Sequence, residues 1–122
     1  MAKYFLDTYA LIEIILGNTK YRRFLESELY TSVFNLYELY YNILRDFNEE
    51  MARKYFFQFK QILFKFGDEQ IFLASKFKLE NKRKKLSYAD CLGYIIAQSN
   101  NMKFLTGDKE FEETEGVEFV RK

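Results

Sequence analysis

The chain has 122 residues, which is enough for one domain with its own core and too few for two. It has no histidine and one cysteine, so the composition excludes histidine-based catalytic triads, zinc sites with histidine ligands and internal disulfides. Nineteen basic and 18 acidic residues give a formal net charge of +1, which neither favours nor excludes a nucleic-acid partner.

Nothing in the sequence indicates secretion or a membrane. No run approaches the roughly 20 apolar residues of a membrane span. Asp7 and Glu13 interrupt the first apolar segment, unlike the apolar region of a signal peptide. We therefore expect a soluble protein of the cytoplasm, and we interpret the lone Cys91 as a helix-packing residue.

The first stretch of the chain predicts a strand, an acid and a helix. Residues 3–6 form a short apolar run without alternation, as expected for a strand of a parallel sheet that is buried on both faces. The run ends at Asp7, and a helix is expected over residues 9–16. Ligands of open α/β sheets bind beyond the carboxyl ends of the strands, so Asp7 is a candidate site residue. The alternative is that Asp7 only caps the helix.

The rest of the chain alternates helices and strands. We expect further helices over residues 20–27, 35–47, 48–63, 69–82, 87–99 and 109–113, and further strands over 29–33, 103–106 and 117–120. The segment 62–67 is ambiguous between a helix end and a short strand. There is no linker or repeat, so residues 1–122 are expected to form a single α/β domain with a largely parallel sheet and right-handed crossovers.

Four acidic residues occupy equivalent places in this pattern. Asp7 and Asp108 each follow a strand, and Glu38 and Asp90 are each expected in the first turn of a helix. Because the carboxyl ends of parallel strands and the starts of the following helices lie at one edge of a sheet, we expect these four side chains to converge.

Each acid also has a purely structural explanation. The pairs Asn35–Glu38 and Ser87–Asp90 have the spacing of a capping box, and the two acids that follow strands are suited to N-caps. Sequence alone leaves both explanations open. If the four acids only cap helices, however, their occurrence at four helix starts near one edge of the sheet is a coincidence.

Converging carboxylates without histidine or thiolate restrict the chemistry. Such oxygen ligands suit Mg²⁺ or Mn²⁺, and several carboxylates cannot all stay ionised at short range without a cation. A divalent ion held there can bind a phosphodiester oxygen and lower the pKa of a water, which indicates phosphodiester hydrolysis. Thr106, two residues before Asp108, is a further candidate because its hydroxyl can orient a water or a phosphate.

These motifs resemble the PIN domain, and in particular the VapC-type ribonuclease toxins of VapBC toxin–antitoxin pairs. The resemblance covers the whole chain and is carried by residues 6–12, Glu38, and the segments 86–90, 105–111 and 116–120. It implies a PIN-like three-layer α/β sandwich, in which a parallel five-stranded sheet of order 3-2-1-4-5 has helices on both faces.

The resemblance also implies a function. It implies an endoribonuclease that depends on Mg²⁺ or Mn²⁺, acts on RNA, forms a homodimer and is inhibited by a small VapB-type antitoxin. By motif, Asp7, Glu38, Asp90 and Asp108 take the acidic metal-site positions of the family. The basic run 82–85, directly before the helix that carries Asp90, is either a solvated helix end or a patch that contacts phosphates.

Two other classes of function remain as alternatives. A receiver domain, which accepts a phosphoryl group, also has a parallel five-stranded sheet and an acidic Mg²⁺ pocket. A receiver domain needs paired acids after the first strand, where this chain has only Asp7. It also needs a lysine after the last strand but one, where this chain has Thr106 and Asp108. The other alternative is a non-catalytic PIN module that binds RNA or a protein partner.

Overall fold

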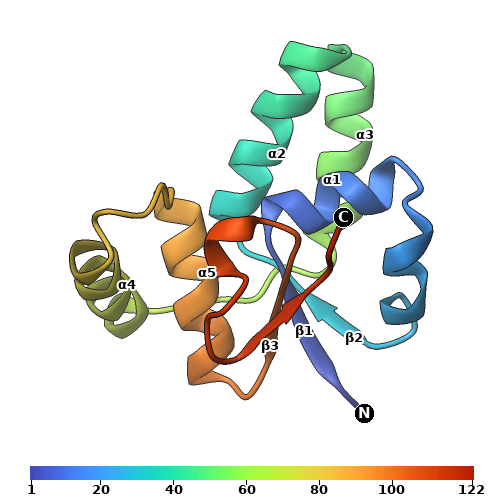
Figure 1. The fold of residues 1–122 in the computed structure, drawn as a ribbon. Helices are drawn as coiled ribbons and strands as arrows, with labels where there is room; N and C mark the ends of the chain where they lie inside the picture. Colours follow the sequence, from blue (N-terminus) through green and yellow to red (C-terminus); the bar gives the residue numbers. More distant parts are fainter.

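A parallel sheet lies between two layers of helices in the computed structural model, which describes all 122 residues (Figure 1). The strands are β1 (Lys3–Leu6), β2 (Glu28–Tyr30), β3 (Lys103–Thr106) and β4 (Val117–Phe119). Their spatial order is β2-β1-β3-β4, and every pairing is parallel. The predicted α/β class with a parallel sheet is therefore confirmed.

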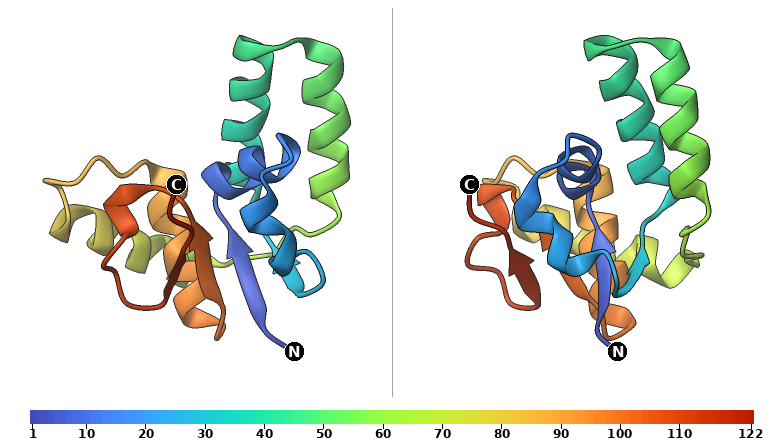
Figure 2. Two further views of the ribbon diagram at one scale, coloured as in Figure 1. Left: turned by 45° about the vertical axis from the view of Figure 1, so that its right-hand side comes forward. Right: turned by 90° about the vertical axis from the view of Figure 1, so that its right-hand side faces the viewer.

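Helices connect the strands and cover the sheet. They are α1 (Thr8–Ile15), α2 (Val33–Asp46), α3 (Glu49–Lys60), α4 (Asp68–Glu80) and α5 (Tyr88–Ser99), together with the short 3-10 helices η1 (Thr19–Phe24) and η2 (Lys109–Phe111). The hairpin of α2 and α3 projects beyond the sheet in all three views (Figure 1, Figure 2). None of these helices combines the length and apolarity needed to span a bilayer.

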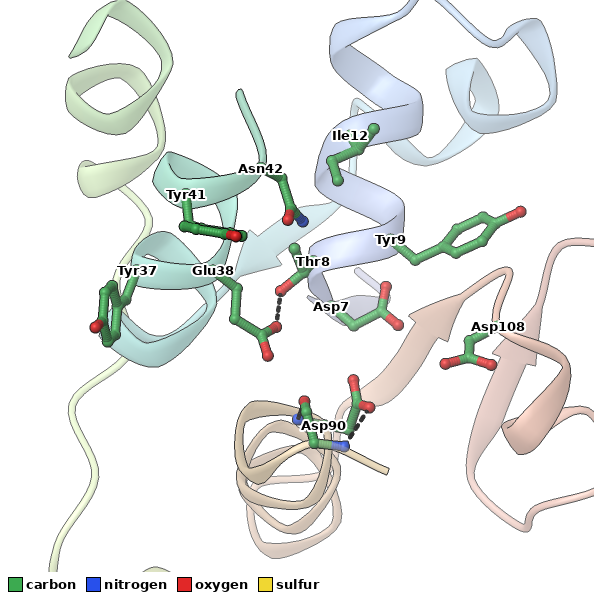
Figure 3. Close-up of a pocket in the computed structure, with 11 residues that line it drawn as sticks. Asp7, Thr8, Tyr9, Ile12, Tyr37, Glu38, Tyr41, Asn42, Asp90 and Asp108 are labelled. Atoms are coloured by element: carbon green, nitrogen blue, oxygen red, sulfur yellow. Dashed lines mark hydrogen bonds between the residues drawn. The ribbon is translucent and has the colours of Figure 1, made fainter. Parts of the chain in front are cut away.

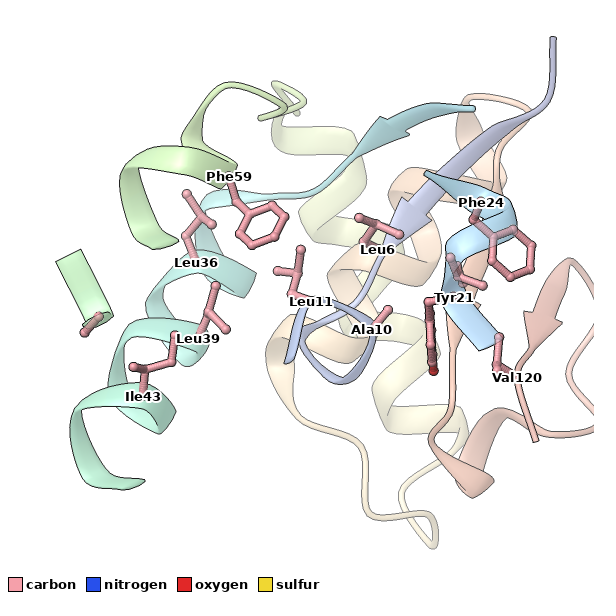
Figure 4. Close-up of a cluster of buried hydrophobic side chains, with 12 residues drawn as sticks. Leu6, Ala10, Leu11, Tyr21, Phe24, Leu36, Leu39, Ile43, Phe59 and Val120 are labelled. Atoms are coloured by element: carbon pink, nitrogen blue, oxygen red, sulfur yellow. The ribbon is translucent and has the colours of Figure 1, made fainter. Parts of the chain in front are cut away.

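Neighbouring residues of the two central strands point to opposite faces of the sheet. Leu6 and Leu105 pack in a cluster with α1, α2 and α3 (Figure 4). Phe5 and Phe104 pack in a second cluster with α4 and α5. All four side chains are fully buried, which explains why the strands show no alternation of apolar and polar residues.

Close packing positions α5 against the sheet. A Cβ atom at Gly93 would lie 2.5 Å from Cε1 of Phe5, so only glycine permits this approach of α5 to β1. The start of α5, which carries Asp90, is thereby fixed near the carboxyl end of β1 (Figure 3).

The prediction of five strands is wrong in number. In place of the third strand there is a single parallel bridge between Thr31 and Leu63. Ser32, directly after Thr31, already caps α2, and residues 61 and 62, directly before Leu63, form the turn that ends α3, so the pairing is limited in both directions. Leu63 lies next to the end of β2, where the third of the five predicted strands was expected, so the predicted spatial order of the segments still holds.

The start of α2 also differs from the prediction. The helix begins three residues earlier than Asn35 suggested: Ser32 is the N-cap and its hydroxyl accepts the N–H of Asn35. Glu38 therefore lies in the second turn, where it cannot cap the helix. The capping explanation of Glu38 is wrong.

Candidate active site

The four predicted acids line one pocket at the carboxyl ends of β1 and β3 (Figure 3). The pocket has a volume of about 520 Å³. Its other lining residues are Thr8, Tyr9, Ile12, Tyr37, Tyr41, Asn42 and Ser87. None of the lining residues is lysine or arginine, so no cationic side chain inside the pocket balances the four carboxylates.

Asp7 is the innermost of the four acids, with 1% of its surface exposed. One carboxylate oxygen accepts the N–H of Ala10 at 2.8 Å, and the other accepts the hydroxyl of Thr106. Burial raises the pKa of Asp7 well above its usual value, and the nearby charges of Asp90 and Asp108 raise it further, while these two hydrogen bonds lower it.

Thr106 joins the two acids that follow strands. Its buried hydroxyl donates to Asp7 and accepts the backbone N–H of Asp108 at 3.0 Å. The hydroxyl proton is thus used within the protein, and Thr106 does not line the pocket. The structure therefore places Thr106 as a residue that positions Asp7 and Asp108; its predicted role in orienting a water or phosphate stays a prediction.

Gly107 lies between Thr106 and Asp108, at a position where the site is too crowded for a side chain. A Cβ atom at Gly107 would lie 2.3 Å from Cε1 of Tyr9 and 2.8 Å from the hydroxyl of Tyr21. A larger residue would push the following carboxylate, Asp108, out of place. Asp108 itself caps η2, with Oδ1 accepting the N–H of Glu110, and its Oδ2 has no hydrogen-bond donor within the protein.

Asp90 caps its helix and lines the pocket at the same time. Its Oδ2 accepts the N–H of Ser87 at 2.8 Å, and its own N–H donates to the Ser87 hydroxyl at 3.0 Å. Burial, followed by the charges of Glu38 and Asp108, raises the pKa of Asp90 to about 6. The capping box and the place in the pocket are thus compatible, because capping uses only one carboxylate oxygen.

A chain of hydrogen bonds that the sequence analysis missed holds Glu38. The Ser32 hydroxyl donates to Asn35, the Asn35 amide donates to Thr8 at 3.2 Å, and the Thr8 hydroxyl donates to Glu38 at 2.7 Å. Two features of the sequence pointed to these residues: Ser32 and Asn35 have the spacing of an N-cap and its partner, and Thr8 directly follows Asp7. The sequence analysis also missed the pocket tyrosines; Tyr37 and Tyr41 adjoin Glu38 and Asn42 on one helix face.

The donor set of the pocket fits a hard divalent cation. Its acidic groups are four carboxylates; burial raises the pKa values of Asp7 and Asp90, and the repulsion between neighbouring carboxylates raises them further. Each carboxylate oxygen can accept more than one bond, so the existing hydrogen bonds leave room for an ion. As the side chains stand, however, no three of them are close enough together to form a ready-made metal site. The pocket gathers suitable ligands without closing them around one point.

The fold is similar to solved structures of toxin–antitoxin proteins. A toxin–antitoxin complex from Klebsiella pneumoniae has a TM-score of 0.74 and 19% sequence identity, covering 100% of both chains. VapC20 of Mycobacterium tuberculosis, described as a toxin that cleaves the sarcin-ricin loop, has a TM-score of 0.76 and 15% identity, covering 98% of this chain and 99% of that one. The DNA-bound VapBC of Salmonella typhimurium has a TM-score of 0.76 and 21% identity, covering 99% and 98%.

At these identities the structural matches establish the fold and not the activity. A comparison with curated proteins gives no match. The profile of the PIN domain matches residues 4–117, which is nearly the whole chain and includes all four pocket acids. The chain therefore belongs to the PIN domain family.

Proposed function

We propose that this protein is an endoribonuclease that hydrolyses RNA phosphodiesters with Mg²⁺ or Mn²⁺, and that it is the toxin of a toxin–antitoxin pair. The observation that carries the proposal is the convergence of Asp7, Glu38, Asp90 and Asp108 in one pocket without a cationic side chain. Such a set of oxygen ligands needs a cation to stay ionised, and a phosphodiester brings further oxygens of the same type.

The four carboxylates would share the work of such a reaction. A divalent ion held by them would supply Lewis acid chemistry for a phosphodiester oxygen and an attacking water. Asp7 is held rigidly by its two hydrogen bonds, so it provides a fixed ligand at the floor of the pocket. Oδ2 of Asp108 and Oε2 of Glu38 have no donor within the protein, so they are free to bind an ion or to accept a proton.

The solved relatives support the wider biological part of the proposal. VapC20 is described as a toxin that cleaves the sarcin-ricin loop, and the other two matches are a toxin–antitoxin complex and a DNA-bound VapBC. We propose a small VapB-type antitoxin as the partner of this chain. A homodimer and a location in the cytoplasm stay predictions; exposed apolar side chains on α4, such as Phe72 and Leu79, are consistent with a second copy.

The structure does not favour the receiver alternative, because no lysine lines the acidic pocket. The non-catalytic PIN module differs from an enzyme in one measurable property: it binds RNA without cutting it. The same experiment therefore tests both.

The test is an RNA cleavage assay with the purified protein. We expect single-stranded or hairpin RNA to be cut with Mg²⁺ or Mn²⁺ and to stay intact in excess chelator. Asp7→Asn should abolish cleavage, whereas Asp68→Asn, which changes an exposed acid at the start of α4, should not. Cleavage that persists in chelator would refute the metal-dependent mechanism, and RNA binding without cleavage under all metals would favour the non-catalytic module.

A further inference from the structure

Two tyrosines on α2 are exposed beside the pocket acids. Tyr37 is 73% exposed and Tyr41 is 58% exposed, although both line the pocket. They lie one helical turn apart on the pocket side of α2, whereas Leu36, Leu39 and Ile43 of the same helix are buried in the core. These two rings do not pack in the core, and their place beside the acids leaves them accessible to a ligand in the pocket.

The rings flank the carboxylates. In Figure 3, Tyr37 and Tyr41 lie on the side of α2 next to Glu38, Asp90 lies below them on α5, and Asp108 lies on the far side of Asp7. A ligand whose reacting atoms lie over the carboxylates therefore has a neighbouring group within reach of α2. In an RNA strand the group next to each phosphate is a nucleoside, whose base is a flat aromatic ring.

The ring of Tyr41 is also supported from one side. The guanidinium carbon of Arg45 lies 5.5 Å from the ring centroid, and Asp46 holds this guanidinium through bonds of 2.8 and 2.9 Å. Arg45 does not line the pocket, so the cation leaves the pocket side of the ring free. A stack of guanidinium, tyrosine and base is a common arrangement for an unpaired nucleotide.

Positive charge lies on the other side of the pocket. The exposed run 82–85 directly precedes Ser87 and Asp90. Lys84 donates to the carbonyl of Glu110, and the N–H of Lys85 donates to its carboxylate, while the N–H of Glu110 donates to Asp108. The basic run is thus attached to the segment that carries Asp108. A strand that crosses the carboxylates therefore meets cations for its phosphates on one side and aromatic rings on the other.

We propose that Tyr37 and Tyr41 form a stacking platform for one or two unpaired bases next to the phosphate that is cut. This inference deepens the proposed function and rests on RNA being the ligand. Bases of a duplex are stacked on each other and paired, so they cannot reach the two rings, whereas splayed bases of loops can. The platform needs the flat ring of tyrosine and not its hydroxyl.

The test measures the binding of a labelled eight-residue oligouridylate by fluorescence anisotropy with Ca²⁺, and a gel checks that the RNA stays intact. We expect Tyr37→Ala with Tyr41→Ala to weaken binding by about 5- to 150-fold per stacked base, which converts the roughly 1–3 kcal/mol of base–aromatic stacking. The matched control, Tyr37→Phe with Tyr41→Phe, keeps the rings and should bind like the wild type. The slope of affinity against salt should be unchanged, because neither variant alters charge.

A series of RNAs that each lack one base shows which bases stack on the tyrosines. Removing one base at a time keeps every phosphate, so the wild type should lose affinity at one or two positions only. The alanine variant should lose nothing further at those positions, because the partner of the base is already gone. Three results would each overturn the proposal. The alanine variant could bind the intact RNA as tightly as the wild type does, or it could lose as much affinity as the wild type when a base is removed. The wild type could also bind a duplex of the same length as tightly as the single strand.

The outcomes also separate this proposal from its rivals and from the proposed function. A change from dimer to monomer in the alanine variant, seen by light scattering without a change in base-dependent binding, would assign the tyrosines to a protein interface and overturn the proposal. Base-dependent binding without cleavage would keep the platform and remove the nuclease. Metal-dependent cleavage without base dependence would do the reverse, and the absence of any RNA binding would overturn both.

Discussion

The two sides of the acidic pocket hold their carboxylates in different ways. On the strand side, Asp7 and Asp108 follow β1 and β3 directly, and the buried hydroxyl of Thr106 bonds to both. On the helix side, Glu38 and Asp90 lie near the starts of α2 and α5 and are held by hydrogen bonds with residues near helix starts. On the strand side, Thr106 and Asp7 are almost fully buried, whereas Asp108 is partly exposed. On the helix side, Glu38, Asp90 and Ser87 are all partly exposed.

This difference has an energetic consequence. A polar group that loses its partner in a dry place keeps the full cost of its desolvation, whereas one in reach of water replaces the lost bond. Two hydroxyls allow a matched comparison, because each accepts the backbone N–H of a pocket acid: Thr106 that of Asp108, and Ser87 that of Asp90.

The largest effect is expected from removing the strand-side hydroxyl. Thr106→Val keeps the shape of the side chain but leaves an Asp7 oxygen without a donor and the Asp108 N–H without an acceptor. We expect it to lower the free energy of unfolding by about 2–4 kcal/mol, because a buried oxygen of Asp7 and the partly buried N–H of Asp108 both lose their partner. Ser87→Ala, on the helix side, should cost about 1 kcal/mol, as for the loss of an ordinary N-cap.

Denaturant unfolding of both variants measures this difference, and Thr106→Ser serves as the control because it retains the hydroxyl. Equal costs for Thr106→Val and Ser87→Ala would show that the two sides are equally accessible to water and would remove the distinction. Cleavage should also fall more with Thr106→Val, since both strand-side acids lose the group that positions them.

The sequence predicted the carboxyl end of the sheet, where the acids lie, better than it predicted the pairing of the outermost segment, residues 62–67. The convergence of the four acids followed from topology alone, because strands and helix starts share one edge. The third strand was not predictable from a local pattern: segment 62–67 pairs only through Leu63, and its length is limited by where α2 begins and α3 ends. Tertiary contacts decide such short pairings.

The partners of the acids were less accessible to sequence reasoning. Thr8 and Glu38 are 30 residues apart, and Thr106 and Asp7 are 99 apart, so no local spacing indicates these hydrogen bonds. The start of α2 was misplaced because both Ser32 and Asn35 are good N-cap residues, and the choice depends on the hydrogen bonds they make in the folded protein.

A pH-dependent effect of intermediate size is expected on the helix side. The pKa of an aspartic acid is about 4 in the unfolded chain, and burial raises the pKa of Asp90 to about 6 in the folded one. Between these values the folded protein holds a proton that the unfolded chain has released, so the free energy of unfolding falls as the pH rises through this window. Partial exposure limits the contribution of Asp90 to about 1–2 kcal/mol.

Asp90→Asn isolates this contribution, because the amide oxygen still accepts the N–H of Ser87. Without metal, the variant should be as stable as the wild type near pH 4 and more stable by about 1–2 kcal/mol at pH 7. Thermal or denaturant melts across pH 4–8 measure the difference, with Asp68→Asn as the control. A variant that is less stable than the wild type at pH 7 would show that the charged cap outweighs the cost of burying this charge beside Glu38 and Asp108.

The smallest effect is expected where the basic run 82–85 joins the two sides. Lys84 and Lys85 precede α5 on the helix side, yet both bond to Glu110 on the strand side. Replacing both lysines by alanine should change the free energy of unfolding by less than about 0.5 kcal/mol, because their side chains are exposed.

If Lys84 and Lys85 contact phosphates, the double alanine variant should bind RNA more weakly, and the slope of log affinity against log salt should decrease by about 0.7 for each lost contact. Replacing Lys65 and Lys76, exposed lysines outside the pocket, removes the same charge and should leave the slope almost unchanged. An equal slope for both pairs would identify the run as a solvated helix end, and the joining of the two sides would then serve structure alone.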